Sequence, residues 1–412
     1  MQAENLVSLY LDLKINTPPE IEYILKSLEE KGFKSYIVGG TVRDFLLGKE
    51  TSDYDITTSA LPGDVHKIFA SCIDTGLKHG TVTVIVNGIK AEVTTFRSDG
   101  DYLNHRSPES VTLASDLKTD LERRDFTMNA LAYNGKIIDL FGGFSDIKSK
   151  IIKSVGDPYK RFDEDALRMM RAARFSCTLG FKIDKSVKKA IKEMGSLISF
   201  VSCERIKTEL DKIVLSDFTK NLSELMDTGF FGYVLPTLQN AIDKKTDFSV
   251  LKKANSLYSK YALLFIIINE KNPKPFLDRY KFSNDEKRNV LSILKYSLIE
   301  MKNIKTTDLK EILSKSGEYV FKEAIGIKNI LGIDTKDLTE KFDKVKNEPY
   351  LVKHLCITGN DLIKIGITGS EIGKTLEFLR KEVIRNKNLN EKDTLIKSAM
   401  RYNNENKSLR KN

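Results

Sequence analysis

The sequence predicts an α+β fold, in which a small sheet-and-helix head is followed by an extended region made entirely of helices. Strand-like runs and turn dipeptides are concentrated before Asp157. Beyond the Asp157–Pro158 dipeptide, apolar residues recur at helical spacing and only four further prolines occur, Pro236, Pro273, Pro275 and Pro349. The change of pattern therefore puts one sheet in the first third of the chain and helices in the rest.

Short runs of β-branched and aromatic residues predict the strands of the head: residues 36–40, 53–58, 81–86, 89–96 and 136–141. The third and fourth of these strands form a hairpin that turns at Asn87–Gly88. VRDFLLG (residues 42–48) is typical of a short helix that ends at a glycine.

Three segments illustrate the helical region: ALRMMRAARF (166–175), ERIKTELDKIVL (204–215) and GKTLEFLRKEVI (373–384). Each repeats apolar residues every three or four positions, which predicts one buried face. No low-complexity linker marks a boundary within this region.

Composition limits the class of protein. The formal charge of +10 over 412 residues favours a polyanionic partner. The four cysteines show no C-x-x-C spacing, which indicates a reducing compartment and argues against a zinc site or a disulfide framework. MQAENLVSLY lacks the basic start of a signal peptide, and the longest apolar run, Ala262–Ile268, is too short to span a bilayer. We expect a soluble, cytoplasmic protein with no membrane partner.

Asp53 and Asp55 are the first candidates for chemistry. Alternate residues of a strand point to the same face, so the two carboxylates would project together, about 7 Å apart. Like charges in this arrangement repel unless cations lie between them, and hard oxygen ligands favour Mg²⁺. On its own, a D-x-D motif more often marks a solvated strand end or a turn. Glu92 is a possible third carboxylate if its strand lies beside this one, although an exposed strand glutamate is an equally good explanation.

The residues before this pair favour a functional site. Gly39–Gly40 would allow a ligand to approach the backbone closely, and the helix that begins near Thr41 would present free N–H groups. Arg43 could add a charge-assisted contact to phosphate, or it could simply pair with Asp44. A phosphate-binding turn beside a metal-binding pair explains both features at once.

Two arginine clusters follow. In DLERRDFTMNALAY (120–133), Arg124 and Asp125 could hold a nucleotide sugar, with the aspartate accepting from a 2′-hydroxyl, or they could belong to a solvated ion-pair cluster at a helix start. Phe126, Met128, Ala130 and Leu131 would supply packing, and Asn129 would cap a helix or bond to the backbone.

The second cluster lies in FDEDALRMMRAARF (162–175), which predicts one helix with Ala166, Met169, Met170 and Ala173 buried. Asp165, Arg168, Arg171 and Arg174 follow at three-residue steps, which is also the pattern of ion pairs on a wet surface. A fixed acceptor, Asp165, beside a fixed donor, Arg168, would suit the pairing edges of cytosine and adenine and oppose those of uracil and guanine.

Taken together, these motifs resemble the class II tRNA nucleotidyltransferases, the CCA-adding enzymes of the DNA polymerase beta superfamily. GGTVRDFLLG…DYD resembles the first family motif, DLERRDFTMNA the ribose motif and DEDALRMMRAARF the amino-acid template for the base. TGLKHGTVTV, VSCERIKTEL, LMDTGFFGYVLP and GNDLIKIGITGSEIGKTL also resemble family segments, so the resemblance spans nearly the whole chain in order.

The resemblance implies a head at residues 1–148, a base-reading neck at 149–214, a helical body at 215–345 and a tRNA-binding tail at 346–412. It implies a template-independent enzyme that adds C, C and A to a tRNA 3′ end from CTP and ATP and releases pyrophosphate. Asp53 and Asp55 would be catalytic Mg²⁺ ligands. The remaining site residues would bind the nucleotide: Gly40, Arg43, Arg124, Asp125, Asp165, Arg168, Arg171 and Arg174.

Related activities stay open at this point. Poly(A) polymerases and enzymes that add only CC or only A share most of the motifs, and a catalytically dead RNA-binding descendant would keep the basic surface. FRSDGDYLNHRSPESV (96–111) resembles the flexible loop that CC-only members lack, with Ser107 where an arginine is usual. The loop and the form of DEDALR favour full CCA addition. A phosphohydrolase domain is not expected, because the C-terminal half contains a single histidine, His354.

Overall fold

A computed structural model describes residues 9–11, 14–51, 53–77, 80–99, 102–103, 107–108, 111–113 and 116–409. The chain divides into two compact units. The first comprises Met1–Lys252, Ile267–Glu270 and Pro275–Lys281, and the second comprises Lys253–Ile266, Lys271–Lys274 and Phe282–Asn412.

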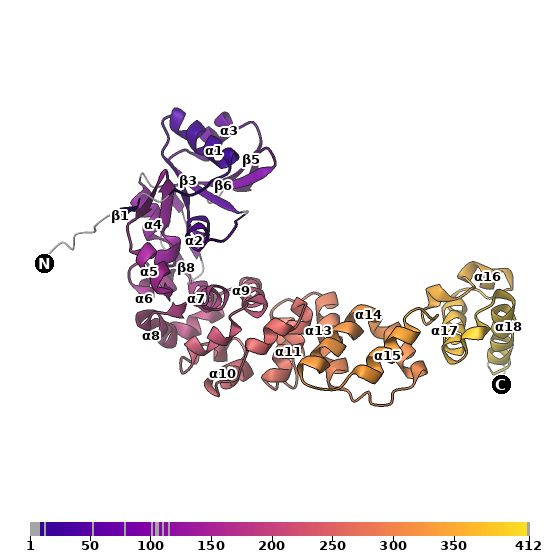
Figure 1. Ribbon diagram of the computed structural model, residues 1–412. Coiled ribbons are helices and arrows are strands. Elements are labelled where there is room, and N and C mark those ends of the chain that lie inside the picture. The colour runs from indigo at the N-terminus through magenta and orange to yellow at the C-terminus, as the bar shows by residue number, and fades with distance from the viewer. Residues whose placement is uncertain are drawn as a thin grey trace. The chain divides into compact units, whose positions relative to one another are not determined.

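The first unit contains an eight-stranded sheet with the order β1-β12-β11-β2-β3-β6-β5-β4 (Figure 1). Its strands are β1 (Leu9–Leu11), β2 (Ser35–Val38), β3 (Tyr54–Thr58), β4 (Cys72–Gly76), β5 (Thr81–Val86), β6 (Ile89–Thr95), β11 (Leu131–Asn134) and β12 (Lys136–Asp139). Neighbouring strands are antiparallel except for β3 and β6, which are parallel. Shorter strands are β7 (Arg97–Asp99), β8 (Tyr102–Leu103), β9 (Ser107–Pro108), β10 (Val111–Leu113), β13 (Ile151–Ile152) and β14 (Lys182–Ile183).

The β5–β6 hairpin follows the sequence prediction. Asn87 and Gly88 both have positive φ, 48° and 85°, as a two-residue hairpin turn requires. Val82, Val84, Ala91 and Val93 alternate along the two strands and are buried. Helix α3 (Pro62–Ile68) packs on β5 and β6 and against α1 (Pro19–Glu30), which leaves the other face of these strands more exposed (Figure 1).

Helix α2 (Gly40–Leu46) connects β2 to β3. Gly48, with φ of 67°, follows its C-terminal end as expected. Asp53 immediately precedes β3 and Asp55 lies within it. The parallel pairing of β3 with β6 sets Asp55 beside Glu92. The strand of Glu92 therefore lies next to that of Asp55, as a role for Glu92 as a third carboxylate of the site requires.

Helices complete the first unit. Their bounds are α4 (Leu117–Glu122), α5 (Gly143–Ser149), α6 (Pro158–Glu164), α7 (Leu167–Leu179), α8 (Lys185–Met194), α9 (Cys203–Leu215), α10 (Pro236–Asp243) and α12 (Lys274–Arg279), with 3-10 turns η2 (Thr127–Asn129), η3 (Gly195–Phe200), η4 (Thr219–Leu225), η5 (Phe230–Tyr233) and η6 (Ser249–Lys253). The apolar faces of α7 and α9 pack against each other.

The prediction of one helix through residues 162–175 is wrong. Helix α6 ends at Glu164 and α7 begins at Leu167, because Asp165 adopts an extended backbone with φ of −145° and ψ of 103°. Its carboxylate accepts a hydrogen bond from the Leu167 N–H at 3.1 Å. A short acidic side chain competes in this way with helical backbone bonds, and here it starts a new helix. Ala166, Met169, Met170 and Ala173 are buried as predicted.

The second unit is helical throughout its described residues. It holds α11 (Leu257–Ile267, whose last residue belongs to the first unit), α13 (Asn284–Leu298), α14 (Thr306–Ile330), α15 (Lys336–Val345), α16 (Gly359–Lys364), α17 (Ser370–Arg385) and α18 (Lys392–Leu409), with turns η7 (Val352–His354) and η8 (Lys387–Leu389). Gly317, with φ of 79°, interrupts α14. Leu362, Leu379, Val383, Leu395 and Ala399 form a core between the last three helices.

The α+β class is confirmed, with the sheet confined to the N-terminal part. The four-part division at residues 148, 214 and 345 stays a prediction. Much of the loop at 96–111 lies outside the described residues, including 100–101, 104–106 and 109–110. Within the described part of the chain, no helix has the length and hydropathy needed to cross a membrane.

Candidate active site

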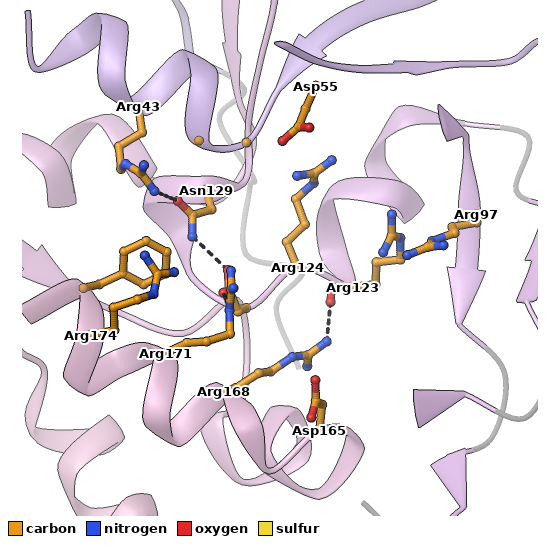
Figure 2. A pocket seen from close by; sticks show the side chains of 14 residues that line it. Arg43, Asp55, Arg97, Arg123, Arg124, Asn129, Asp165, Arg168, Arg171 and Arg174 are labelled. Atoms are coloured by element: carbon orange, nitrogen blue, oxygen red, sulfur yellow. Dashed lines mark hydrogen bonds and ion pairs between the residues drawn. The ribbon is translucent and has the colours of Figure 1, made fainter. Parts of the chain in front are cut away.

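A pocket of about 480 Å³ opens between the sheet and α7 in the first unit. Seven arginines and three aspartates line it, together with two glycines, one asparagine and one phenylalanine: Gly39, Gly40, Arg43, Asp55, Arg97, Arg123, Arg124, Asp125, Asn129, Asp165, Arg168, Arg171, Arg174 and Phe175. In Figure 2, Arg43 and Arg174 lie on one side, Arg97 and Arg123 on the other, and Arg124 reaches toward Asp55. The excess of positive charge suits a polyanionic ligand.

Gly39 forms part of the pocket wall next to Arg124. It precedes α2 with φ of 72° and ψ of −133°, a conformation that glycine adopts more readily than other residues. A Cβ at this position would lie 2.9 Å from Arg124 Nη1 and 3.5 Å from Asp55 Oδ2. The glycine therefore permits the arginine and the carboxylate to meet over the start of the helix.

The sequence left two roles open for Arg43, a contact to phosphate and an ion pair with Asp44, and the structure is compatible with both. Its Nε and Nη2 donate to Asp44 at 2.9 and 2.8 Å, yet the side chain also lines the pocket. Its Nη1 donates to Asn129 Oδ1 at 2.6 Å. The prediction that Asn129 caps a helix or bonds to backbone is wrong, because its Nδ2 donates to Asp125 Oδ1 at 3.0 Å. Asn129 thus links Arg43 to Asp125 through two hydrogen bonds.

Asp125 lies at the centre of this network and is 7% exposed. Its Oδ1 also accepts from the Phe126 N–H at 2.8 Å, and its Oδ2 accepts from Arg171 Nε at 2.7 Å. Burial alone would raise the pKa of this carboxyl, but the Arg171 charge and the bonds from Asn129 and Arg171 outweigh burial and hold the pKa well below its usual range. Asp125 is therefore a fixed acceptor.

Asp120 anchors the two arginines that precede Asp125. This carboxylate is completely buried; it accepts from Arg123 at 2.8 Å and from Arg124 at 3.3 Å. The alternative of a solvated cluster at a helix start is wrong, since these arginines follow the C-terminal end of α4 and their partner is buried. Burial opposes ionisation of Asp120, but the two arginines lower its pKa overall.

Phe175 supports three of the arginines. The guanidinium carbons of Arg43, Arg171 and Arg174 lie 5.1, 5.3 and 3.7 Å from the centre of its ring. The ring itself is buried and meets Phe126 edge to face. Cation–π contacts of this kind offset part of the repulsion between neighbouring arginines.

Asp165 and Arg168 enter the pocket from the break between α6 and α7 (Figure 2). The break keeps them adjacent, because the Arg168 N–H donates to the Asp165 carbonyl at 3.0 Å. The Asp165 carboxylate also accepts from Arg205 at 2.7 Å, and a carboxylate has further acceptor capacity.

The Arg168 guanidinium is held from three directions. It donates to Glu164 Oε2 at 2.6 Å, to the Arg161 carbonyl at 3.1 Å and to the Arg123 carbonyl at 2.8 Å. These bonds use three of its five N–H groups, and the guanidinium is positioned before any ligand enters.

Arg171 and Arg174 are paired on the side of α7 that faces α9. Arg174 Nε donates to Glu209, and Arg171 Nη1 lies 3.9 Å from the same carboxylate. Both arginines also line the pocket. Glu209 is nearly fully buried, so it neutralises part of the cationic wall from behind.

Asp53, Asp55 and Glu92 line a second pocket, which shares Asp55 with the first. Burial raises the pKa of Asp55, the nearby Arg124 charge lowers it, and the Glu92 and Asp53 charges raise it, with a net upward shift. Such crowding of carboxylate oxygens suits a divalent cation. Among the described residues, no three acidic, histidine or cysteine side chains are close enough to form a complete metal cage. Two carboxylates plus ligand oxygens would be needed.

Nine of the ten residues singled out from the sequence line the first pocket, and the tenth, Asp53, lines the adjacent one. Gly39, singled out with Gly40 as a place where a ligand could approach the backbone, also lines this pocket, whereas Arg97, Arg123, Asn129 and Phe175 were not predicted as site residues. Arg123 and Asn129 lie in the motif that was singled out, whereas Phe175 was regarded only as part of a helix. Local sequence carries no signal that Arg97 faces this pocket.

Three family models match the chain. The model described as "Poly A polymerase head domain" covers residues 35–153, the one described as "Probable RNA and SrmB- binding site of polymerase A" covers 180–242, and the one described as "tRNA nucleotidyltransferase domain 2 putative" covers 253–399. Together they account for most of the length.

Several similar proteins are CCA-adding enzymes. The chain is 37% identical over 400 residues to the CCA-adding enzyme of Limosilactobacillus fermentum, covering 94% of this chain and 98% of that protein. It is 38% identical over 357 residues to the CCA-adding enzyme of a Geobacillus species, covering 83% and 86% of the two chains.

Solved structures agree with these relatives. The Bacillus stearothermophilus CCA-adding enzyme in complex with CTP superposes with a TM-score of 0.78 at 32% identity, covering 95% of this chain and all of that one. The Thermotoga maritima CCA-adding enzyme complexed with tRNA has the same fold, with a TM-score of 0.61 at 21% identity over 94% and 96% of the two chains.

The Asp125 network makes stability depend on pH. Because the pKa of Asp125 is lowered on folding, its contribution is present above the unfolded pKa of about 3.9 and is lost as the pH falls through and below that value. We expect Asp125→Asn to lower the free energy of unfolding at pH 7 by about 1–3 kcal/mol. Urea unfolding between pH 7 and pH 3 should show a smaller loss of stability for the variant than for wild type. Asp217→Asn, at an exposed position, is the control. If the free energy of unfolding fell in parallel with pH for wild type and both variants, the stabilising role assigned to Asp125 would be contradicted.

Proposed function

The chain belongs to the family of CCA-adding enzymes, and from this premise we propose how its residues carry out the family reaction. It is a tRNA nucleotidyltransferase that uses CTP and ATP to extend the tRNA 3′ end by C, C and A without a nucleic-acid template. In each step the RNA 3′-oxygen bonds to the α-phosphorus of the nucleotide, and the bond to pyrophosphate breaks.

One observation carries the proposal: an arginine-lined pocket ends at Asp55, where a cluster of carboxylates begins. Phosphoryl transfer is catalysed mainly by positioning and by neutralising the charge on phosphate oxygens. An enzyme that joins nucleotides needs both a cationic site for the triphosphate and an acidic edge for metal ions. A dead RNA-binding descendant would need only the basic surface.

The triphosphate is proposed to bind near Gly40, Arg43 and Arg124. Gly40 lies at the first turn of α2 and both arginines line the same pocket. Arg124 is held by Asp120 at 3.3 Å while it lines the pocket, so its charge is available to a phosphate group bound there. The Arg171 and Arg174 guanidinium groups add to the positive potential.

Asp125 is proposed to read the ribose. Its oxygens already accept three hydrogen bonds, and its lowered pKa keeps it ionised as an acceptor for a 2′-hydroxyl. DNA precursors lack this donor, so they would lose the hydrogen bond to Asp125 that a ribonucleotide makes.

Asp53 and Asp55 are proposed to hold Mg²⁺, with Glu92 beside them on β6. The carboxylates of Asp53 and Asp55, completed by oxygens of the ligand, fit the requirement of this cation for hard oxygen donors. When bound, the metal supplies Lewis-acid stabilisation of the phosphate oxygens and lowers the pKa of the attacking hydroxyl. The protein holds the carboxylates in register through the parallel β3–β6 pairing, and Arg124 balances their charge.

The base is proposed to pair with Asp165 and Arg168. Asp165 accepts from the exocyclic amine of cytosine or adenine, and Arg168 donates to the adjacent ring nitrogen. Uracil and guanine would set a carbonyl against the carboxylate and an N–H against the guanidinium. Leaving buried groups unpaired in this way gives strong discrimination.

Full CCA addition is favoured over poly(A) or single-A addition because the similar proteins named above are CCA-adding enzymes at 37–38% identity. The first family model bears the name of a poly(A) polymerase head, but that head covers only residues 35–153. The helical body and tail, proposed as 215–345 and 346–412, would bind tRNA. We propose that the enzyme works in the cytoplasm on this substrate.

Supplying a tRNA that lacks its CCA end with CTP and ATP, separately and together, tests this function. Two additions with CTP alone and a third with both nucleotides are expected. A long A tail would identify a poly(A) polymerase, and a single A on a tRNA already ending in CC, with no C addition, would identify an A-adding enzyme.

Asp53→Ala should reduce incorporation by at least about a hundredfold, because removing one carboxylate weakens the stabilisation of the phosphate oxygens. Asp53 is exposed, so the fold should persist. Electrophoretic assays of CMP addition and a separate tRNA-binding assay distinguish loss of chemistry from loss of substrate. Asp217→Ala is the control, and turnover of Asp53→Ala near the wild-type rate would refute the metal role.

Asp165→Ala should relax base choice. Losing a charge-assisted acceptor is expected to lower the preference for CTP over UTP by about tenfold to a hundredfold. The measured quantity is the ratio of kcat/KM for the two nucleotides. Asp165→Asn adds an amide donor that suits the uracil O4 atom, and it should admit UTP better than the alanine variant does. Unchanged exclusion of UTP by both variants would count against the template.

A further inference from the structure

Thr57 is a buried polar residue on the strand that carries Asp55. Strand β3 has a neighbour on each side, and Thr57 pairs with Tyr36 on β2 and with Thr94 on β6. It follows Asp55 by two residues, so both side chains point to the same face of the sheet. Thr57 is 1% exposed, and its hydroxyl donates to Asp120 Oδ2 at 3.2 Å. A valine would fill this position without a polar group to satisfy, so folding alone does not account for the hydroxyl.

Helix α4 brings Asp120 to this face of the sheet. Leu121, the residue that follows it, belongs to a buried apolar cluster with Val38 on β2, and Tyr36 packs against that cluster. Because Tyr36 and Thr57 pair across β2 and β3, the helix packs next to Thr57. Asp120 itself is completely buried. The position of its carboxylate is therefore set by the packing of the helix on the sheet.

The two oxygens of Asp120 have different partners. Oδ1 accepts from Arg123 Nε at 3.1 Å and from Nη2 of the same residue at 2.8 Å. Oδ2 accepts from Thr57 at 3.2 Å and from Arg124 Nη2 at 3.3 Å. Burial raises the pKa of Asp120, and the two arginines more than offset this, so charge neutralisation does not require the hydroxyl. What the hydroxyl adds is a link: one carboxylate oxygen joins strand β3 to the guanidinium of Arg124.

Arg124 completes this link on the side of the pocket. While its Nη2 donates to Asp120, its Nη1 lies 2.9 Å from the point that a Cβ of Gly39 would occupy, and Asp55 Oδ2 lies 3.5 Å from the same point. Figure 2 shows the side chain reaching toward Asp55. A closed path therefore runs from Asp55 along β3 to Thr57, through Asp120 to Arg124, and back to the neighbourhood of Asp55. Each member of such a path is positioned from two sides.

The distance between Arg124 and Asp55 matters for the proposed reaction. The arginine is proposed to bind the triphosphate and the carboxylate to hold Mg²⁺, so both act on the same phosphate groups. Phosphoryl transfer depends on positioning, and a misplacement of about 1 Å can lower a rate by about a hundredfold. Neither Thr57 nor Asp120 is among the described residues that line the pocket, so both would act through the arginine that they hold.

We propose that Thr57 and Asp120 are positioning residues, which hold Arg124 at a fixed distance from Asp55 so that the arginine and the metal act on the same phosphate groups. The proposal rests on the nucleotidyltransferase function and extends it to two side chains that do not touch the substrate. It also accounts for a hydroxyl on a strand face that helix α4 covers.

The test compares Thr57→Val with Thr58→Val. Thr58 is the next residue on β3 and is completely buried, and its hydroxyl donates to the Lys34 carbonyl at 2.7 Å on the other face of the sheet, so it is a matched control. For Thr57→Val, the single-turnover rate of CMP addition should fall about tenfold, because Arg124 and the metal lose their alignment. The dissociation constant for CTP should rise about fivefold relative to that for cytidine, which has no phosphates. Thr58→Val should change neither quantity.

A double-mutant cycle tests whether Thr57 acts through Arg124. In an Arg124→Lys background the guanidinium that Asp120 holds is gone, so adding Thr57→Val should change the single-turnover rate less than about twofold. Thr58→Val should have the same small effect in both backgrounds. The proposal would be overturned if the effects of Thr57→Val and Arg124→Lys simply multiplied, or if Thr57→Val weakened the binding of CTP and cytidine equally.

A conservative variant gives a second readout if Thr57→Val folds poorly. Thr57→Ser keeps the hydroxyl and should retain a rate within about twofold of wild type, whereas Thr57→Ala should be slow; equal rates for the two variants would contradict the role of the hydroxyl. If wild-type protein adds no nucleotides to tRNA, the proposed function itself fails. If wild type is active and Thr57→Val matches it in rate and in CTP affinity, only the positioning role fails.

Discussion

The active site depends on one buried carboxylate, Asp125, that joins separate parts of the first unit. It accepts from Arg171 on α7 and from Asn129, which in turn accepts from Arg43 on α2. A buried charge costs several kcal/mol unless it is paired and hydrogen-bonded, so these partners must occupy their positions for the fold to be stable. The same requirement sets the relative position of α2 and α7, and thereby the width of the arginine-lined pocket between them.

The concentration of arginines raises a second physical problem. Seven guanidinium groups around one pocket repel each other, and the chain answers with carboxylates placed behind them. Asp44, Asp120, Glu164 and Glu209 pair with Arg43, Arg123, Arg168 and Arg174, respectively. Phe175 fills the space between three of the arginines. Since these pairs hold the arginines before a ligand arrives, less conformational entropy is lost when a triphosphate binds.

The sequence predicts structure correctly where neighbouring residues determine it. Alternation and the Asn87–Gly88 turn define the hairpin, and the spacing of apolar residues defines the buried face of α7. It failed where a partner distant in sequence decides the outcome. The role of Asn129 depends on Arg43, 86 residues away, and Arg97 reaches the pocket through the tertiary fold alone. The break at Asp165 follows from a bond two residues away, but helical periodicity on both sides conceals it.

The residues proposed to select the base and those proposed to bind phosphate are connected through the backbone. Arg168 donates to the carbonyl of Arg123, and the next residue, Arg124, lies against Gly39 beside Asp55. One peptide unit therefore separates the side chain proposed to read the base from the one proposed to bind the phosphates. A base that displaces Arg168 disturbs the backbone that carries Arg124, and close packing leaves little room to absorb the shift. Under the proposed assignments, discrimination acts on the geometry of the reacting phosphate as well as on affinity, and this would let a site without a nucleic-acid template refuse a nucleotide whose triphosphate fits.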